Sequence, residues 1–208
     1  MDKMSITKRV LTITVLVSAL AIIQFTATGC GCDCGDGNGE EFPQHILDKA
    51  DQLIISKVGA DYFKEYISYA PTQSKIVGSD YDFTYYFAIP GKEYVREFIT
   101  FTLDSLGNPA ANRDIIGIPN CLEKPGECEF TVDEAAARSI AEKNGMDKGI
   151  DEWKVIFKWE KEYDRYVWHI LNYYSKSEGS QGFRGNGKSM YIDANNGTVL
   201  KFSDWFVR

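Results

Sequence analysis

The sequence predicts an α+β fold of two tandem repeats, each with one helix packed on a small antiparallel sheet. Two segments, beginning at Pro43 and Thr131, carry apolar residues at helical spacing. Each is followed by aromatic-rich stretches in which apolar and polar residues alternate, as they do in strands. The helix starts lie 88 residues apart, and the turns at Asp104 and Asp193 lie 89 residues apart. This nearly constant offset indicates a structural repeat.

Residues 1–29 have the pattern of an export signal. The basic residues Lys3, Lys8 and Arg9 precede an uncharged apolar run over residues 10–23. The run has the length of a signal-peptide apolar region and is shorter than the roughly 20 apolar residues of a spanning helix. We therefore predict a secretion signal, with a single N-terminal membrane anchor as the alternative.

The signal ends in a short run of small residues, Ala27, Thr28 and Gly29, directly before Cys30. This arrangement resembles the lipobox of bacterial lipoproteins, in which the signal is cleaved before the cysteine and the thiol receives a diacylglyceryl group. The resemblance implies lipidation at Cys30 and an extracytoplasmic, membrane-anchored protein that faces the periplasm or the cell surface. Acyl chains such as palmitate anchor a protein because each buried methylene contributes about 0.8 kcal/mol.

The charge balance excludes one class of partner. The 208-residue chain is 44% hydrophobic and 25% charged, which is the composition of a globular protein. Removal of residues 1–29, which carry a net charge of +2, changes the net charge from −7 to −9. A protein with this negative charge repels phosphate backbones, and the sequence has no basic stripe to offset the repulsion. We therefore expect no nucleic-acid partner.

Residues 30–41 have the composition of a flexible acidic tether. They consist of glycine, acidic residues, asparagine and cysteine, with no apolar side chain that could join a core. Cys32 and Cys34 form a strained disulfide, link to another chain or stay free as thiols; the sequence leaves these alternatives open. The surrounding glycines disfavour a preorganised metal cage.

The first repeat is expected at residues 42–120. A helix begins at Pro43 and ends near Gly59, with one apolar face. Residues 62–70 are compatible with a further helical turn or a strand, and residues 71–78 are expected to form a loop. Residues 80–89 and 94–103 then alternate as two strands of a hairpin.

The second repeat is expected at residues 121–208. Thr131 is predicted to cap a helix, with Glu134 completing a capping box and Gly145 closing the helix. Four strands are predicted after it, the last two joined by a tight turn at Ala194-Asn195-Asn196-Gly197. Their ranges are 152–160, 165–175, 189–193 and 198–202.

Two parts of this second half resemble a known family. The segment from Met190 to Leu200 has an apolar alternating strand, an aspartate, a small loop with glycine and a Val-Leu strand, as PepSY domains do. The capped, alanine-rich helix resembles the start of the same family, so the resemblance spans about Phe130 to Phe202. It implies a PepSY/cystatin-like fold and a role in peptidase inhibition or peptide binding. The segment GIPNCLEKPGECEF also resembles bacterial lipoproteins with PepSY-like domains.

In the predicted turn between the last two strands, Asp193 is expected to accept backbone N–H groups and Gly197 to supply a positive φ. We interpret both as turn chemistry.

Cys121 and Cys128 enclose a short loop with Pro125-Gly126 at its turn. Zinc sites favour closer cysteine pairs, whereas an exported protein favours a disulfide. We predict a structural disulfide, with a free pair as the alternative. It would stabilise the fold by about 2–3 kcal/mol in the chain-entropy model.

The segment from Gly182 to Ser189 matches the P-loop pattern GxxxxGK[ST]. A working P-loop needs a following helix, whereas here an alternating strand and a turn follow. We therefore expect no nucleotide and interpret residues 176–187 as a glycine-rich hairpin loop. This loop carries Phe183 and Arg184 and is a candidate contact surface.

No catalytic or metal-binding motif is visible. His45 and His169 lack a neighbouring His, Cys or paired carboxylate, and neither HExxH nor GxSxG occurs. The sequence therefore predicts neither an enzyme nor a metal or cofactor site.

Aromatic residues are abundant, and Trp153, Phe157 and Trp159 alternate along one strand. One interpretation is that they fill the thin core between helix and sheet. The other is an exposed patch, in which Trp153 and Trp159 join Phe183 and Arg184 as a binding surface.

The main functional hypothesis is a non-enzymatic, lipid-anchored extracytoplasmic protein that recognises or inhibits a peptidase or binds a peptide. The alternative is a structural or assembly lipoprotein that braces other envelope proteins. An enzyme with a novel site is a third possibility, which requires a deep pocket with converging ionisable groups.

Overall fold

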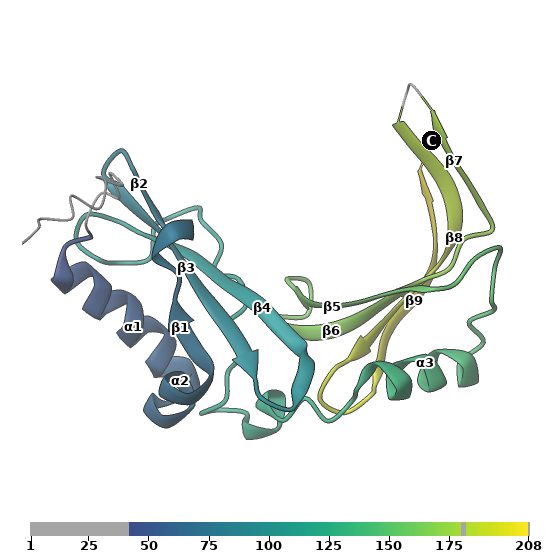
Figure 1. The fold of residues 1–208 in the computed structure, drawn as a ribbon, viewed down its shortest axis with the longest axis horizontal. Coiled ribbons are helices and arrows are strands. Elements are labelled where there is room, and N and C mark those ends of the chain that lie inside the picture. The colour runs from purple at the N-terminus through teal and green to yellow at the C-terminus, as the bar shows by residue number, and fades with distance from the viewer. Residues whose placement is uncertain (1–41, 180–181, 208) are drawn as a thin grey trace, which may run out of the picture. The chain divides into compact units, whose positions relative to one another are not determined.

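A computed structural model describes residues 42–179 and 182–207 and shows an α+β fold (Figure 1). The described residues form three α-helices: α1 (Gln44–Val58), α2 (Ala60–Tyr66) and α3 (Glu134–Lys143). None of these helices has the length and apolar character needed to span a membrane. The predicted signal, the tether, Cys30, Cys32 and Cys34 lie outside the described residues.

The strands form two antiparallel sheets. The first contains β1 (Ile67–Tyr69), β2 (Lys75–Val77), β3 (Asp80–Ile89) and β4 (Lys92–Leu103). The second contains β5 (Lys154–Glu160), β6 (Arg165–Leu171), β7 (Ser175–Gly179), β8 (Gly182–Asp193) and β9 (Val199–Val207). The predicted fold class is therefore confirmed, whereas the tandem repeat stays a prediction.

The first helix forms as its sequence pattern predicts. Its buried positions recur every four residues along one face: Ile46, Ala50, Ile54 and Val58. The carbonyl of Pro43 accepts the N–H groups of the first turn, and Gly59 ends the helix with a φ of 88°. The non-helical φ at this position is what glycine adopts at least cost.

The middle of the first half holds more structure than the sequence reveals. The ambiguous residues 62–70 are divided between the end of α2 and β1. The expected loop over residues 71–78 contains a 3-10 turn and β2. β1 and β2 pair with different parts of β3, and strands of three residues are too short for their alternation to be read.

The cap of α3 corrects a prediction. Asp133, not Thr131, is the N-cap, and its Oδ1 accepts the N–H of Ala136 at 2.7 Å. Glu134 is consequently the first helical residue, so the predicted capping box does not form. The Thr131 hydroxyl instead donates to the carbonyl oxygen of Asn195, which holds the helix approach against the β8–β9 turn.

The glycine-rich loop predicted over residues 176–187 is also wrong. The described residues of this range belong to β7 and the first half of β8, which pair antiparallel from Ser175 opposite Asn186 onward. The predicted strand 165–175 ends earlier, at Leu171, and β9 continues past residue 202 to Val207. Gly187 is needed in this strand because a Cβ there would lie 2.1 Å from the carbonyl oxygen of Asn172.

Both sheets contribute to one hydrophobic core. Phe130, in the segment that links them, is fully buried and its ring lies 5.9 Å from Phe87 of β3 and 5.5 Å from Tyr166 of β6. The Tyr166 hydroxyl donates to the carbonyl oxygen of Gly117 at 2.8 Å. Burial of a hydroxyl requires such a partner, so this bond fixes the second sheet against the loop that follows β4.

Candidate functional site

Part of the second sheet extends beyond β5 and β6 as a narrow three-stranded structure (Figure 1). We call this part the three-stranded extension; it consists of β7, residues 182–188 of β8 and residues 203–207 of β9. β8 pairs with β6 only over residues 189–193. β7 is exposed at every position, so the extension is the most accessible part of the sheet.

One face of the extension carries an aromatic cluster. The rings of Tyr173 and Phe183 lie 5.3 Å and 6.4 Å from that of Trp205, respectively. The indole Nε1 of Trp205 donates to the carbonyl oxygen of Asn172 at 3.1 Å, which fixes the ring. Phe183 remains 41% exposed, so it can contact a partner at little entropic cost because its neighbours already restrict it.

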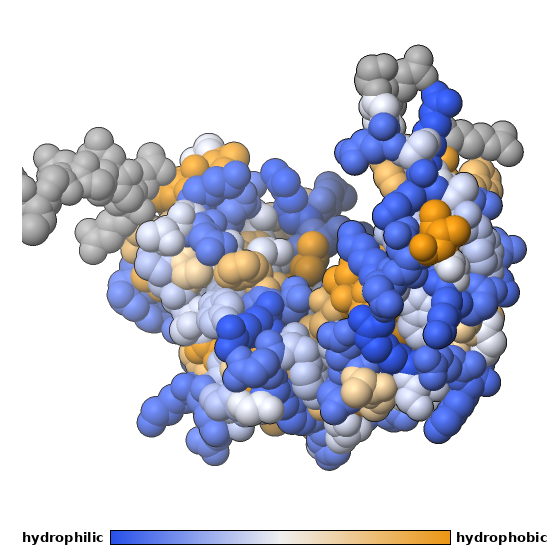
Figure 2. All heavy atoms as spheres, turned by 45° about the vertical axis from the view of Figure 1, so that its right-hand side comes forward, coloured by the Kyte–Doolittle hydropathy of each residue, from blue (hydrophilic) through white to orange (hydrophobic). Residues whose placement is uncertain are grey.

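The opposite face of the extension forms an open groove of about 690 Å³. Its lining combines small polar side chains, one arginine and one large ring: Ser175, Ser177, Asn186, Arg184 and Phe206. Phe206 is 69% exposed. Figure 2 shows that exposed hydrophobic patches are separate from one another on a mostly hydrophilic surface. The predicted residues Phe183 and Arg184 both lie on the extension.

Trp153 and Trp159 are not part of this surface. Trp153 is buried and donates its Nε1 hydrogen to the carbonyl oxygen of Asp147 at 2.8 Å. Trp159 packs against the core, with its ring 5.1 Å from that of Tyr166. The interpretation of these tryptophans as core residues therefore holds, and their place in an exposed binding patch is corrected.

The P-loop match has no P-loop geometry. Gly182 to Ser189 all belong to β8, and a turn and β9 follow instead of a helix. Backbone N–H groups along a strand alternate between its two edges, so they cannot converge on a phosphate as they do in a P-loop.

The disulfide between Cys121 and Cys128 is present, with a Cα–Cα distance of 5.5 Å. It closes the segment that links the two sheets. The same segment is held to α1 by a hydrogen bond from the Leu122 N–H to the carbonyl oxygen of Lys57 at 3.0 Å.

His169 and Ser189 form a pair that resembles a base beside a nucleophile. Nε2 of His169 lies 2.9 Å from Oγ of Ser189, and the imidazole is stacked on Tyr191 at 4.2 Å. Burial, followed by the nearby positive charge of Lys158, lowers the pKa of His169 to about 4. Ser189 is only 5% exposed, so its hydroxyl is not accessible to a substrate. This geometry favours a structural role.

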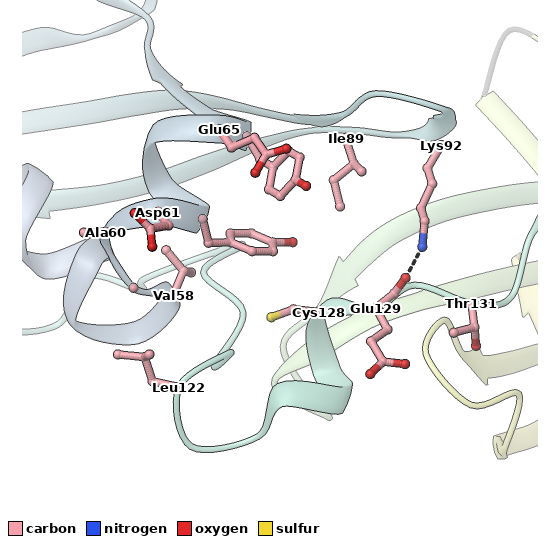
Figure 3. A pocket seen from close by; sticks show the side chains of 13 residues that line it. Val58, Ala60, Asp61, Glu65, Ile89, Lys92, Leu122, Cys128, Glu129 and Thr131 are labelled. Atoms are coloured by element: carbon pink, nitrogen blue, oxygen red, sulfur yellow. Dashed lines mark hydrogen bonds between the residues drawn. The ribbon is translucent and has the colours of Figure 1, made fainter.

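A second cavity, of about 890 Å³, lies between the α2 region and the segment that links the two sheets (Figure 3). α2, the β3–β4 turn and the disulfide segment line it. Lys92 extends toward Glu129, where its Nζ donates to the backbone carbonyl (Figure 3), and it also donates to the carbonyl oxygen of Phe130 at 3.0 Å. The hydroxyl of Tyr62, also in the lining, is buried and has no hydrogen-bond partner among the described residues.

The lining of this cavity mixes apolar side chains with carboxylates, and residues from three separate segments contribute to it. No sequence motif joins these segments, so sequence reasoning did not identify the cavity. The acidic residues Asp61 and Glu65 in the lining repel anions, so the cavity does not favour a compact anion.

Comparison with known families identifies the second half. Residues 131–202 match the PepSY family, described as peptidase propeptide and YPEB domain. This part of the chain is therefore PepSY-like, as the resemblance predicted. A search of curated proteins and a search of solved structures found no match to the chain. The match runs from just before α3 into β9, so it includes most of the three-stranded extension.

Proposed function

We propose that this chain is a binding protein, not an enzyme, whose PepSY domain holds a peptide or a segment of a peptidase on the three-stranded extension. The observation that carries the proposal is the position of the extension. It belongs to a domain of the peptidase-propeptide type, and it presents Phe183, 41% exposed, beside a supporting aromatic cluster. Aromatic rings on a rigid support are the usual anchors of protein–peptide contacts.

The proposal places the protein outside the cytoplasm, anchored to a bacterial membrane by lipid on Cys30. The signal-like residues 1–29 and the small residues before Cys30 support this location. A disulfide in the described chain is compatible with an oxidising compartment. The Cys30→Ala variant tests the anchor, because it should move the protein from the membrane fraction to the soluble fraction.

The binding proposal is tested by photo-crosslinking in intact cells. A photoreactive phenylalanine analogue replaces Phe183, and the same analogue replaces Val77, which is 43% exposed on β2 of the other sheet. Mass spectrometry then identifies what each position captures. We expect a peptide or a peptidase at position 183 and not at position 77. Equal capture at both positions, or capture at neither, would overturn the proposal.

If position 183 instead captures folded envelope proteins with no peptidase or peptide among them, the bracing function replaces the proposed one.

A further inference from the structure

The outer edge of β9 is an unused edge of the second sheet. β9 pairs with β8 along one side, and no described strand pairs with its other side. β9 has nine residues, contains no proline and carries Phe202 at 39% and Phe206 at 69% exposure. A long edge strand of this kind is a template for hydrogen bonding by another chain.

The hydrogen bonds of β8 show which groups of β9 face outward. The N–H of Lys188 donates to Oδ1 of Asn172 at 2.6 Å, and its carbonyl accepts the Asn172 N–H at 3.0 Å. Both groups of Lys188 therefore point away from β9. Because Asp204 is directly opposite Lys188, the two form a non-hydrogen-bonded pair. The N–H and carbonyl of Asp204 consequently point to the outer edge.

The same alternation turns the backbone groups of Phe202 outward as well, since Phe202 is two residues away. Phe202, Asp204 and Phe206 share one face of the sheet. In the described part of the chain, the Asp204 carboxylate has neither an ion-pair partner nor a hydrogen-bond partner. It is thus an acidic group between two exposed rings on an edge strand with available backbone groups.

We propose that the outer edge of β9 binds an extended polypeptide by antiparallel strand addition, and that it prefers an apolar, a basic and an apolar side chain at alternate positions. This inference rests on the proposed peptide-binding function and specifies its mode. The added strand would place its basic side chain opposite Asp204 and its apolar side chains opposite Phe202 and Phe206. Cross-strand pairs of these kinds stabilise a sheet.

A foreign segment fits this edge better than a second copy of β9. Two-fold pairing of identical edges keeps each residue on its own face of the sheet. Lys201, the basic residue within β9, is on the face opposite to Asp204 and is paired with Glu162 at 3.3 Å. No two-fold register places it opposite Asp204. Lys188, which is opposite Asp204 on β8, has its Nζ over the ring of Phe202 at 5.2 Å from the ring centroid. A basic side chain on the outer side of Asp204 therefore comes from an added strand of another chain.

The test uses labelled synthetic peptides and the full chain of 208 residues. The first peptide has valine, lysine and valine at alternate positions between threonines, with both ends blocked. The second has glutamate in place of lysine. In two further peptides, backbone N-methyl groups are placed either on the valine–lysine–valine positions or on the threonines.

Strand addition predicts a specific ranking in fluorescence anisotropy. N-methylation at the valine–lysine–valine positions should abolish binding, because those N–H groups face β9, whereas N-methylation at the threonines should leave it within about twofold. The glutamate peptide should bind about two- to fivefold more weakly than the lysine peptide. Equal effects of the two methylation patterns would overturn the inference.

Protein variants give an independent readout. Asp204→Pro removes one outward N–H and should weaken the lysine peptide about tenfold, since proline is tolerated on an edge strand. Asp204→Ala keeps that N–H and should lose only the preference for lysine over glutamate. Circular dichroism checks that both variants fold. If Asp204→Pro does not fold, the comparison of the two methylated peptides tests strand addition without it.

The remaining outcomes separate this inference from the proposed function. If no synthetic peptide binds, or if binding ignores Asp204→Pro, strand addition at β9 is rejected while capture at position 183 still supports peptide binding. If wild-type protein sediments as a dimer and Asp204→Pro as a monomer, the edge pairs with a second copy and the inference is overturned.

Discussion

Nη1 of Arg165 lies 2.7 Å from Oδ2 of Asp193, whose side chain is only 1% exposed. Arg165 also lies 3.1 Å from Glu127 in the segment that links the two sheets. Oδ1 of Asp193 accepts the N–H of Asn195 at 2.8 Å, as the turn pattern predicted. The pair therefore joins three parts of the chain: the start of β6, the β8–β9 turn and the linking segment.

Breaking this pair should destabilise the fold, because it leaves a carboxylate buried without its counter-ion. The hydrogen bond to Asp193 raises the pKa of Arg165, so the guanidinium is charged throughout the accessible pH range. We expect Arg165→Met to lower the free energy of unfolding by about 2–3 kcal/mol in urea titrations. This lies below the range for fully buried pairs because Arg165 is partly exposed.

Lys161→Met is the matched control for this prediction. Lys161 pairs with Asp114 at 2.7 Å, but both side chains are more than half exposed. The control should cost less than about 1 kcal/mol. Equal losses for the two variants would show that burial of Asp193 is unimportant.

The sequence predicted elements whose pattern is regular and long. The four-residue spacing of α1, the alternation of β3 and the Cys121–Cys128 pair were all visible because each depends on residues close in the chain. The PepSY resemblance was visible for the same reason, since it rests on one helix start and one turn.

The sequence failed where a distant residue decides the local structure. β8 looks like a loop because it is rich in glycine, but its path is fixed by Asn172, which bonds the backbone of Lys188. The choice of Asp133 as cap depends on the engagement of Thr131 with Asn195. The sequence did not reveal that β9 is an edge strand. The alternation of apolar and polar residues predicts a strand but does not show which strands lie beside it.

The disulfide should contribute to stability without affecting the sheets themselves. The Cys121→Ser/Cys128→Ser double variant should lose about 2–3 kcal/mol of unfolding free energy, because the closed loop is short. The measurement is chemical denaturation without reductant. Wild-type protein treated with reductant should approach the stability of the variant, and an unchanged midpoint in both cases would contradict the prediction.

Because the two sheets share one core, a destabilising substitution in the first sheet should also lower the stability of the second sheet. All four tryptophans lie in the second half, so their fluorescence reports on the second sheet. Phe87 of β3 is fully buried, and its ring lies 5.7 Å from that of Tyr166. Phe87→Ala should destabilise the tryptophan-monitored transition by about 3–5 kcal/mol.

Phe98→Ala is the control for the shared core. Phe98 lies on the same sheet but is 43% exposed, so its truncation should cost less than about 1 kcal/mol. If Phe87→Ala leaves the tryptophan transition unchanged while lowering helix content, the two halves fold independently. That outcome would agree with the predicted boundary between the repeats at residue 121 and would contradict a shared core.

His169 should make stability depend on pH in the mildly acid range. Burial lowers its pKa in the folded state to about 4, from the usual 6.5 of an exposed histidine. Between these values the unfolded chain binds a proton that the folded chain does not, so stability is complete above pH 6.5 and declines as the pH falls toward 4. Because the ring is partly exposed, we expect a loss of only about 1–2 kcal/mol.

His169→Gln isolates this contribution, since glutamine retains a hydrogen-bonding group for Ser189 but does not titrate. Carboxylates change protonation over the same range in both proteins, so the difference between the two pH profiles belongs to His169. Urea titrations at pH 4, 5, 6 and 7 should therefore show the profiles converging toward pH 4, with the wild type relatively more stable at pH 7. Parallel profiles would mean that the imidazole is protonated in the folded protein as readily as in the unfolded chain, which the stacking on Tyr191 and the bond to Ser189 argue against.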